Sequence, residues 1–385
     1  MEAIELIELI GRGEDSHTQF KENQEVTNAQ SLAGELVAFA NTKGGRIIIG
    51  VKDDGVVTGL SGQDIRRINQ LLSNTASQGV HPSINPETEN VSVGGRLVMV
   101  VTVREGISKP YSDNGGVIWV KCGPDKRRVT AREEIQRMLQ SAGLVHADEV
   151  PVEGTTGADV DLAHFREFFE KSYGEPLEER DAPVKLENLR LARNGVLNLA
   201  GLLLFARYPQ RHRPELVVKA VSFVGSDPAG DRYRDSQDIG GCLRDIHART
   251  ISFLQRNLRR IQAGQGFNTE GELEVPASAL EELVVNMLVH RDYFISAPWK
   301  LMLFDDRIEL ISPGSLPNNL TVENIRNGIS NMRNPLIASF ATKELPYRGL
   351  GTGIRRAVAA VPTLSLVSSN ELNLFTATIP RRPEH

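Results

Sequence analysis

The sequence predicts an α+β protein built from three parts, on the strength of three observations. Runs rich in β-branched residues alternate with segments of helical periodicity, a stretch rich in Gly, Pro and acids lies at 143–160, and an apolar helix near 280–293 carries one polar seam. We expect a mixed N-terminal domain over 1–142, a linker over 143–160, a largely helical middle region over 161–265 and a C-terminal α/β sandwich over 266–385.

Composition limits the function classes. The 385 residues include 44 Lys and Arg against 49 Asp and Glu, so the net charge is −5 and any nucleic-acid affinity must come from local basic patches. Two cysteines are too few for a disulfide framework or a cysteine zinc site. No apolar run approaches about 18 residues, and the N-terminus has acids where a signal peptide has bases. We therefore expect a cytoplasmic protein that contacts no membrane.

The first domain has the pattern of a sheet with helices. An amphipathic helix is expected at 2–11 and a buried helix at about 28–40. Asn41 and Gly44-Gly45 end the second helix, the strand 46–51 follows, and Asp53-Asp54-Gly55 turns the chain. A helix at about 61–73 and strands near 90–94, 96–104 and 117–121 are also expected.

Basic residues of this domain are the candidates for nucleic-acid contact. Three of them, Lys126, Arg127 and Arg128, are consecutive, and Lys21, Lys43 and Lys52 lie near the turns. A solvated loop would carry the same charges, so both interpretations stay open at this stage.

The middle region begins at Asp161, which can cap a helix whose Phe165, Phe168 and Phe169 recur at helical spacing and predict a core stripe. A strand at 217–224 and a long amphipathic helix at about 241–262 follow.

The helix near 280–293 carries the strongest polar signal. Glu282, Asn286 and His290 recur every four residues and so share one stripe, while the other directions are apolar. A buried carboxylate and amide need partners, which protein, water, metal or ligand could supply. An internally hydrogen-bonded core seam and the wet face of a surface helix are the plainer alternatives.

Two glycine-containing motifs follow this helix. Strands at 299–304 and 307–311 flank Asp305-Asp306 as a hairpin, and Ser312-Pro313-Gly314 comes next. Further on, Gly349, Gly351 and Gly353 alternate before a helix that starts at Ile354. Alternating glycines at a helix entrance let backbone N–H groups approach a phosphate.

This order of motifs resembles the GHKL ATPase domain shared by gyrase, the heat-shock chaperone of ninety kilodaltons, histidine kinases and mismatch-repair proteins. It is similar to the divergent form in C-terminal regions loosely labelled helicase-related or AAA-type, in which HRDY, SPG-x-LP and RNP, here Arg333-Asn334-Pro335, also occur.

The resemblance implies ATP and Mg²⁺ as cofactors. Asn286 would hold Mg²⁺, Glu282 would position or activate water, and Gly349, Gly351 and Gly353 would form the phosphate lid. It also places His290, Ser312, Gly314 and Arg333 in the nucleotide site. Ser312 stands where the family has an adenine-reading Asp, which exchanges a charge-assisted hydrogen bond for a neutral one of about half the strength.

The first domain resembles the Schlafen AlbA-like domain. The motif FAN-x-x-GG before a strand, an upstream Glu and F-K, Lys109-Pro110 and a closing Lys121-x-Gly123 carry the resemblance. In nucleolytic Schlafens two glutamates and an aspartate bind metal and cut RNA. Glu14 matches the first glutamate and Asp53 or Asp54 matches the aspartate, and Glu14 with Asp53 would bind Mg²⁺ or Mn²⁺. Gln19 takes the position of the second glutamate and brings no charge.

Three functions fit these motifs. The first is a nucleotide-responsive regulator that binds ATP with Mg²⁺ in its C-terminal domain and DNA or RNA on its N-terminal domain. The second is a metal-dependent endoribonuclease that uses Glu14 and Asp53, acting on RNA such as tRNA in phage defence. The third is a non-catalytic, self-associating scaffold. A homodimer is expected by resemblance, and the chain ends without the winged-helix domain that would favour transcription regulation.

Overall fold

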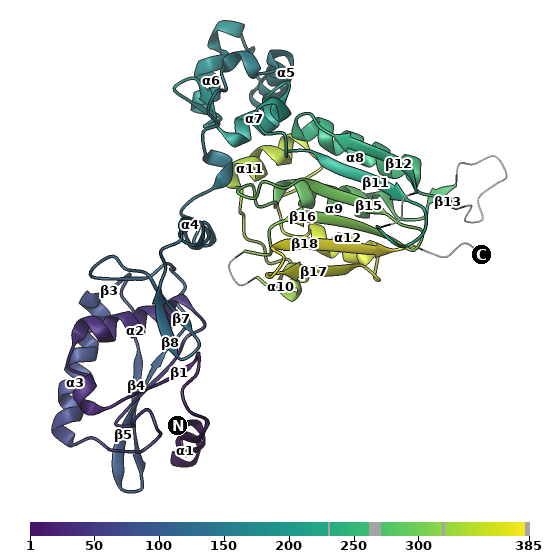
Figure 1. The fold of residues 1–385 in the computed structure, drawn as a ribbon. Coiled ribbons are helices and arrows are strands. Elements are labelled where there is room, and N and C mark those ends of the chain that lie inside the picture. Colours follow the sequence, from purple (N-terminus) through teal and green to yellow (C-terminus); the bar gives the residue numbers. More distant parts are fainter. Residues whose placement is uncertain (230–231, 262–270, 318–319, 382–385) are drawn as a thin grey trace. The chain divides into compact units, whose positions relative to one another are not determined.

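The structure is a computed structural model that describes residues 1–229, 232–261, 271–317 and 320–381. The chain divides into two compact units, Met1–Val145 and His146–His385, each with its own sheet and helices (Figure 1). The predicted α+β class is confirmed. No helix in these ranges is long and apolar enough to cross a membrane.

A four-stranded sheet in the order β1-β2-β5-β4 forms the centre of the first unit. β1 and β2 pair in parallel, and the other neighbours are antiparallel. The strands of this sheet are β1 (Thr18–Lys21), β2 (Gly45–Ile49), β4 (Glu87–Val93) and β5 (Arg96–Val103). Two small ladders pair β3 (Val80–His81) with β6 (Ser112–Asp113) and β7 (Trp119–Cys122) with β8 (Asp125–Arg128).

Helices cover both faces of this sheet. Successive residues of a strand point to opposite sides, and β2 has apolar residues on both sides that must be buried. Ile47 and Ile49 of β2 share one core cluster with residues of α2 (Ala29–Asn41) and α3 (Gly62–Asn74). Ile48 lies in another cluster with Leu6 and Ile10 of α1 (Ala3–Arg12). The remaining helical segments of the unit are η1 (Asn23–Glu25), η2 (Thr75–Gly79) and α4 (Arg132–Ser141).

A six-stranded mixed sheet in the order β12-β11-β15-β16-β18-β17 is the frame of the second unit. Only β11 and β15 among its neighbours pair in parallel. Its strands are β11 (Val218–Phe223), β12 (Tyr233–Ile239), β15 (Trp299–Leu303), β16 (Arg307–Pro313), β17 (Ser365–Ser369) and β18 (Leu374–Pro380). The hairpin predicted at 299–311 is confirmed as β15 and β16.

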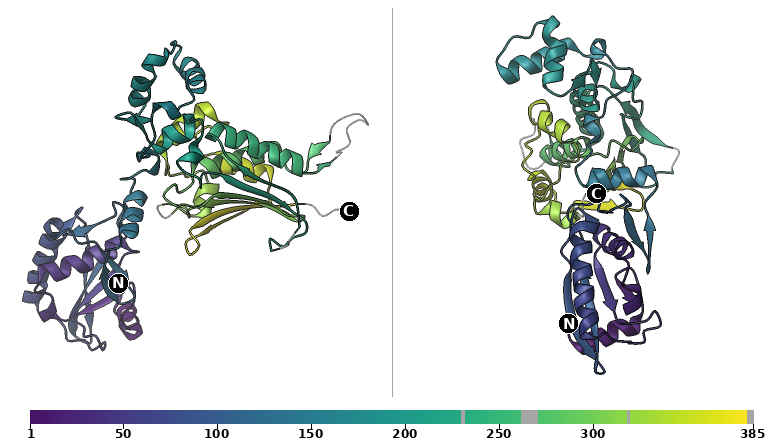
Figure 2. Two further views of the ribbon diagram at one scale, coloured as in Figure 1. Left: turned by 45° about the horizontal axis from the view of Figure 1, so that its top comes forward. Right: turned by 90° about the vertical axis from the view of Figure 1, so that its left-hand side faces the viewer.

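Three helices cover one face of this sheet: α8 (Leu243–Asn257), α9 (Ala277–Val289) and α12 (Gly353–Ala360) (Figures 1 and 2). α9 is the central one and packs against α8, α12 and β16. Val284 and Leu288 on α9 are fully buried. The sandwich predicted around the 280–293 helix is therefore confirmed.

A helical layer completes the second unit around an aromatic cluster. The ring of Phe205 lies 5.1 Å from Phe165 and 5.0 Å from Phe168, and Phe168 lies 5.4 Å from Phe340. The helices of this layer are α5 (Leu162–Tyr173), α6 (Ala182–Asn188), α7 (Leu199–Phe205) and α11 (Pro335–Glu344). The short helix α10 (Val322–Arg326) lies apart from them and contacts α12 and β17. Short elements are η3 (Ala147–Glu149), η4 (Gly157–Asp159), η5 (Glu179–Asp181), η6 (Pro209–Arg211), β9 (Ala192–Arg193), β10 (Val196–Leu197), β13 (Arg260–Ile261) and β14 (Glu272–Leu273). Asp161 caps α5 as predicted, accepting hydrogen bonds from two backbone N–H groups.

The observed division differs from the expected one in two ways. β11, β12 and α8 come from the 161–265 region but complete the sheet and helical layer of the C-terminal part. Val218, Phe253 and Trp299 share a single apolar cluster, so neither region has a core of its own. The 143–160 stretch is packed and not a free linker, since Asp148, Val152 and Val160 within it are buried.

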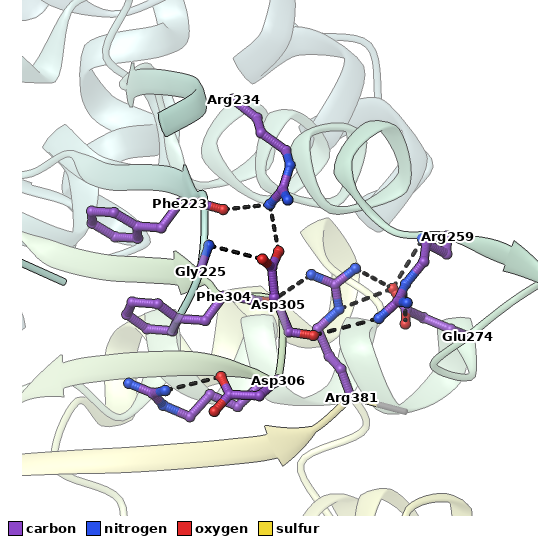
Figure 3. Close-up of polar contacts among 10 residues, drawn as sticks. Phe223, Gly225, Arg234, Arg259, Glu274, Phe304, Asp305, Asp306 and Arg381 are labelled. Atoms are coloured by element: carbon purple, nitrogen blue, oxygen red, sulfur yellow. Dashed lines mark hydrogen bonds and ion pairs between the residues drawn. The ribbon is translucent and has the colours of Figure 1, made fainter. Parts of the chain in front are cut away.

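Charged side chains fix the sheet at the turn between β15 and β16 (Figure 3). Asp305 accepts a hydrogen bond from the Gly225 N–H at 2.8 Å and forms an ion pair with Arg234 at 2.6 Å. Arg381, just after β18, donates to the Phe304 carbonyl and pairs with the buried Glu274 at 2.6 Å. Removing one partner of a buried pair costs about 3–5 kcal/mol, so this network anchors the last strand.

Asp148 attaches the start of the second unit to α11. Its Oδ2 accepts a hydrogen bond from the Ile337 N–H at 2.9 Å in the first turn of that helix, and the residue is fully buried. Within the described residues its Oδ1 accepts no hydrogen bond. Burial raises the pKa of Asp148 to about 6, although the backbone N–H groups oppose this shift.

The raised pKa predicts that Asp148 makes the second unit less stable as pH rises. Below the ordinary pKa of 3.8 the carboxyl is protonated in both states, and stability is lost as pH rises through about 6, where the folded unit must ionise a buried group. A shift of this size corresponds to roughly 3 kcal/mol. Asp148→Asn should remove this loss between about pH 4 and pH 7.

The measurement is urea unfolding followed by Trp299 fluorescence in a Trp119→Phe background, because the chain has only these two tryptophans. The exposed Glu153→Gln in the same segment is the control and should keep the wild-type pH profile. An Asp148→Asn protein that keeps the wild-type profile would contradict this interpretation of Asp148.

Candidate functional site

One cavity lies beside the polar seam of α9 in the second unit. Its empty space, including the part open to solvent, is about 1070 Å³. All nine C-terminal candidates line it: Glu282, Asn286, His290, Ser312, Gly314, Arg333, Gly349, Gly351 and Gly353. The fold thus brings together residues that are up to 71 positions apart in the sequence.

A buried carboxylate network forms the inner end of the cavity. Glu282, 7% exposed, accepts a hydrogen bond from Asn286 Nδ2 at 2.8 Å and pairs through Oε2 with Arg356 of α12 at 2.5 Å. Asn286 Nδ2 also donates to the Glu282 carbonyl at 2.7 Å. The amide nitrogen of Asn286 is therefore used, and none of the described residues donates to its Oδ1.

The second glycine motif meets the same carboxylate. A Cβ on Gly353, the first residue of α12, would lie 1.6 Å from Glu282 Oε1. A Cβ on Gly351 would lie 2.5 Å from the Gly328 carbonyl oxygen, and the φ angle of Gly351 is +69°. Only glycine lets this segment pass so close to α9 and to the loop after α10.

The first glycine motif forms another part of the cavity wall. Ser312, at the end of β16, donates its hydroxyl hydrogen to the Met287 carbonyl at 3.2 Å, which leaves the oxygen as an acceptor. Gly314 has a φ of +102°, and a Cβ there would meet Asp292 at 2.5 Å and the Arg333 guanidinium at 2.6 Å. Arg333 also donates to the Ser315 carbonyl at 2.9 Å.

His290 ties α9 to the loop that carries the second glycine motif. Its Nε2 lies 3.2 Å from the Tyr347 hydroxyl. Burial lowers the pKa of His290 to about 4, and burial raises the pKa of Tyr347 to about 12. At neutral pH the imidazole is therefore uncharged and the phenol is protonated.

The rest of the cavity wall is mainly apolar. Leu283, Met287, Leu310, Ile325 and Phe375 all line it. A planar, weakly polar group suits these walls, whereas the polar groups gather at Glu282 and at the two glycine motifs.

The N-terminal carboxylates are arranged differently. Glu14 Oε1 accepts hydrogen bonds from Gln19 Nε2 at 2.5 Å and from the Phe20 N–H at 2.6 Å. Gln19 Oε1 in turn accepts from the Lys121 ammonium at 2.8 Å. Asp53 is exposed. Across the described residues no three His, Cys, Asp or Glu side chains gather in a way that could hold a metal ion.

These donors do not fit the expected Mg²⁺ or Mn²⁺. One oxygen of Glu14 already accepts hydrogen bonds from two N–H groups. Gln19, the uncharged residue at the position of the missing carboxylate, accepts a hydrogen bond from the Lys121 ammonium. A divalent ion would have to displace the cation that already balances this site.

Two of the three consecutive basic candidates are paired with acids. Lys126 contacts Glu35 at 2.8 Å, and Arg127 contacts Glu134 at 2.7 Å. Arg128 is exposed, with its guanidinium 5.1 Å from the Trp119 ring centre. Lys43 and Lys52 are exposed and Lys21 is half-buried. The predicted basic patch is thus weaker than the sequence count indicates, because its neighbours in space include acids.

Comparison with known families connects these two sites to described domains. Residues 14–130 match the Schlafen AlbA_2 family. Residues 297–370 match the family described as putative ATP-dependent DNA helicase RecG C-terminal. The chain carries a Schlafen AlbA_2 domain and a RecG-type C-terminal domain. Both predicted resemblances are confirmed. Among curated proteins, none matches the chain.

Two solved structures are similar to this chain. The DIP2311 protein from Corynebacterium diphtheriae is 19% identical, with a TM-score of 0.46, over 96% of this chain and 65% of its own. This chain therefore spans just under two thirds of that protein. The N-terminal domain of a putative ATP-dependent DNA helicase RecG-related protein from Nitrosomonas europaea is 22% identical, with a TM-score of 0.25, over 34% of this chain and 96% of its own.

Three residues in or behind the cavity wall were not among the sequence candidates. Arg356 and Tyr347 line the cavity, and Asp292 supports Gly314 from behind. Asp292 and Arg356 each lie in a motif already noted, HRDY and RGLGTGIRR. Only the fold shows that they contact Gly314 and Glu282, because the partners are distant along the chain.

The tight approach of Gly353 predicts that a single methyl group there disrupts the cavity. Gly353→Ala must displace the Glu282 carboxylate, so it should abolish the rise in melting temperature that a bound nucleotide causes. A ligand at 100 times its dissociation constant stabilises by roughly 2.7 kcal/mol, or about 5–10 °C in a domain of this size.

Thermal melting with and without ATP and Mg²⁺ provides the measurement. The matched control is Gly157→Ala, since a Cβ at Gly157 meets no atom within 4 Å. A wild-type-sized nucleotide shift in Gly353→Ala would show that the cavity tolerates this methyl group and would contradict the prediction.

Proposed function

We propose that this protein is a nucleotide-responsive nucleic-acid-binding regulator, with ATP and Mg²⁺ in the cavity of the RecG-type domain and DNA or RNA on the AlbA_2 domain. The observation that carries the proposal is that all nine residues chosen from sequence line one cavity beside α9. The names of the two matched families point in the same direction.

The cavity residues fit a nucleotide with its metal. Asn286 Oδ1 is an oxygen without a hydrogen-bond partner in the described part of the chain, which suits Mg²⁺, a cation that neutralises phosphate charge. The N–H groups near Gly351 and Gly353 begin α12 and suit an anion. The Ser312 oxygen can accept from an exocyclic amine between the apolar walls.

The geometry supports binding more strongly than hydrolysis. Both oxygens of Glu282 already accept hydrogen bonds, one from Asn286 and one from Arg356. These bonds take two of the roughly four lone-pair sites of the carboxylate and fix its orientation, whereas a carboxylate that activates water needs a lone pair aimed at that water. We therefore propose that the nucleotide acts mainly as a bound effector.

A response to nucleotide requires a connection from the cavity toward the AlbA_2 domain. His146, the first residue of the second unit, lies with Nδ1 3.2 Å from the Arg333 carbonyl, and Asp148 binds Ile337. Arg333 lines the cavity. The chain that leads out of the first unit is thus attached to a cavity residue, and a ligand that moves Arg333 acts on that attachment.

Nucleic-acid contact is proposed at the exposed basic residues of the AlbA_2 domain. Lys43, Lys52 and Arg128 are exposed, and their positive charges can contact phosphates. The pairing of Lys126 and Arg127 with acids predicts modest, salt-sensitive affinity.

The proposal predicts that nucleotide strengthens nucleic-acid binding through Asn286. Fluorescence anisotropy with labelled single-stranded and duplex DNA and RNA, with and without ATP and Mg²⁺, should show at least a several-fold gain in wild type. A ligand shifts an equilibrium only by its different affinities for the two states, so Asn286→Ala should remove this gain and keep the basal affinity.

The double variant Lys43→Ala with Lys52→Ala should instead lower the affinity for nucleic acid in the absence of nucleotide, and the gain on adding nucleotide should remain.

Nucleic-acid affinity that is equal with and without nucleotide in wild type would contradict the regulatory proposal. Metal-dependent RNA cleavage lost in Glu14→Ala would favour the ribonuclease alternative.

A further inference from the structure

We propose that Arg356 is the residue that distinguishes a nucleoside triphosphate from a diphosphate in this cavity. This role depends on the proposed nucleotide site, which it deepens by naming the group that selects the ligand. The side chain contacts the inner carboxylate and also faces the cavity.

Arg356 stands at the boundary between a buried charge and solvent. Its Nη2 lies 2.5 Å from Glu282 Oε2, with the Arg356 side chain 40% exposed and the Glu282 side chain 8% exposed. A guanidinium has five N–H donors. Apart from Glu282, no group in the described part of the chain accepts a hydrogen bond from the Arg356 guanidinium, so most of its N–H donors remain available.

The expected position of the phosphates brings them to this guanidinium. Asn286 Nδ2 donates a hydrogen bond to the Glu282 carboxylate at 2.8 Å. Gly353 lies so close to the same carboxylate that a methyl group on its Cα would overlap with it. Phosphates held by Asn286 and by the start of α12 therefore lie near Glu282. An ionised carboxylate repels them, and the repulsion grows with each added negative charge.

Arg356 removes that repulsion and can add hydrogen bonds of its own. It already neutralises Glu282, and its free N–H groups match phosphate oxygens in a planar fork. The ion pair with Glu282 fixes one end of the side chain beforehand, which lowers the entropy lost on binding. A nucleoside triphosphate has one more phosphate than a diphosphate, and the charge and oxygens of that phosphate give the Arg356 guanidinium an additional group to bind.

The other cavity arginines are placed differently. Arg333 is attached to the Ser315 carbonyl beside the first glycine motif. Arg348 is exposed on the loop between Tyr347 and Gly349. Within the described residues, Arg356 is the cation that the structure pairs with Glu282.

Calorimetric titration of ATP and of ADP, each with Mg²⁺, tests this role. Wild type should bind ATP about 10- to 100-fold more tightly than ADP, the value of one charge-assisted hydrogen bond. Arg356→Gln should lower the affinity for both nucleotides, because Glu282 then repels their phosphates, but it should lower the affinity for ATP about 10- to 100-fold more, so that the two affinities become equal. Arg355→Gln, on the same helix but outside the cavity lining, is the matched control and should change neither.

Two further variants keep the test valid if Arg356→Gln fails to fold because Glu282 has lost its partner. Arg356→Lys keeps the charge but loses the fork, so a reduced preference for ATP is expected. The double variant Glu282→Gln with Arg356→Gln removes both charges and should show no preference. Melting without nucleotide reports whether each variant is folded.

The outcomes separate this role from the proposed function. Wild type that binds neither nucleotide would overturn both. Wild type that binds ATP and ADP equally would overturn the role of Arg356 alone. An equal loss of both affinities in Arg356→Gln, a preference that survives in the double variant, or a preference removed by Arg348→Gln would also overturn it.

Discussion

The buried carboxylate of Glu282 is the interaction on which the cavity of the second unit depends. It joins α9 to α12 through Arg356 and requires glycine at 353, so it fixes where the second glycine motif ends and α12 begins. A buried ionised group must be paired and hydrogen-bonded, and here Asn286 and Arg356 meet that requirement. Because α9 packs against β16, α8 and α12, the same helix positions the sheet, the second glycine motif and the cavity.

In the first unit too, a carboxylate is close to a cation, but there the two are connected through a glutamine side chain. The Lys121 ammonium, Gln19 amide and Glu14 carboxylate form a chain of hydrogen bonds at the place where a metal was expected. Burial lowers the pKa of Lys121, and the carboxylates of Glu35 and Glu14 oppose that shift. The unit therefore satisfies its carboxylate internally, which favours a binding role over metal-dependent cleavage.

Much of the fold followed from the sequence because local signals agreed with the final structure. The four-residue spacing of Glu282, Asn286 and His290, the β15–β16 hairpin and the Asp161 cap all depend on residues close in sequence. Pairings between residues that are far apart in the chain could not be predicted from the sequence. Glu282 meets Arg356 across 74 positions and Lys126 meets Glu35 across 91, and no local pattern reports such contacts. The expected division at 265/266 lies inside the second unit for the same reason, since β11 pairs with β15, which begins 76 residues after Phe223.

Hydrogen–deuterium exchange of the full chain with and without ATP and Mg²⁺ tests the central claim most directly, because it locates binding without relying on a variant. A nucleotide bound beside α9 should slow exchange in both glycine motifs, residues 312–317 and 347–353, while strand β5 of the first unit serves as an internal reference. Unchanged exchange in these two segments at saturating nucleotide, or slower exchange confined to other parts of the chain, would contradict a nucleotide site beside α9.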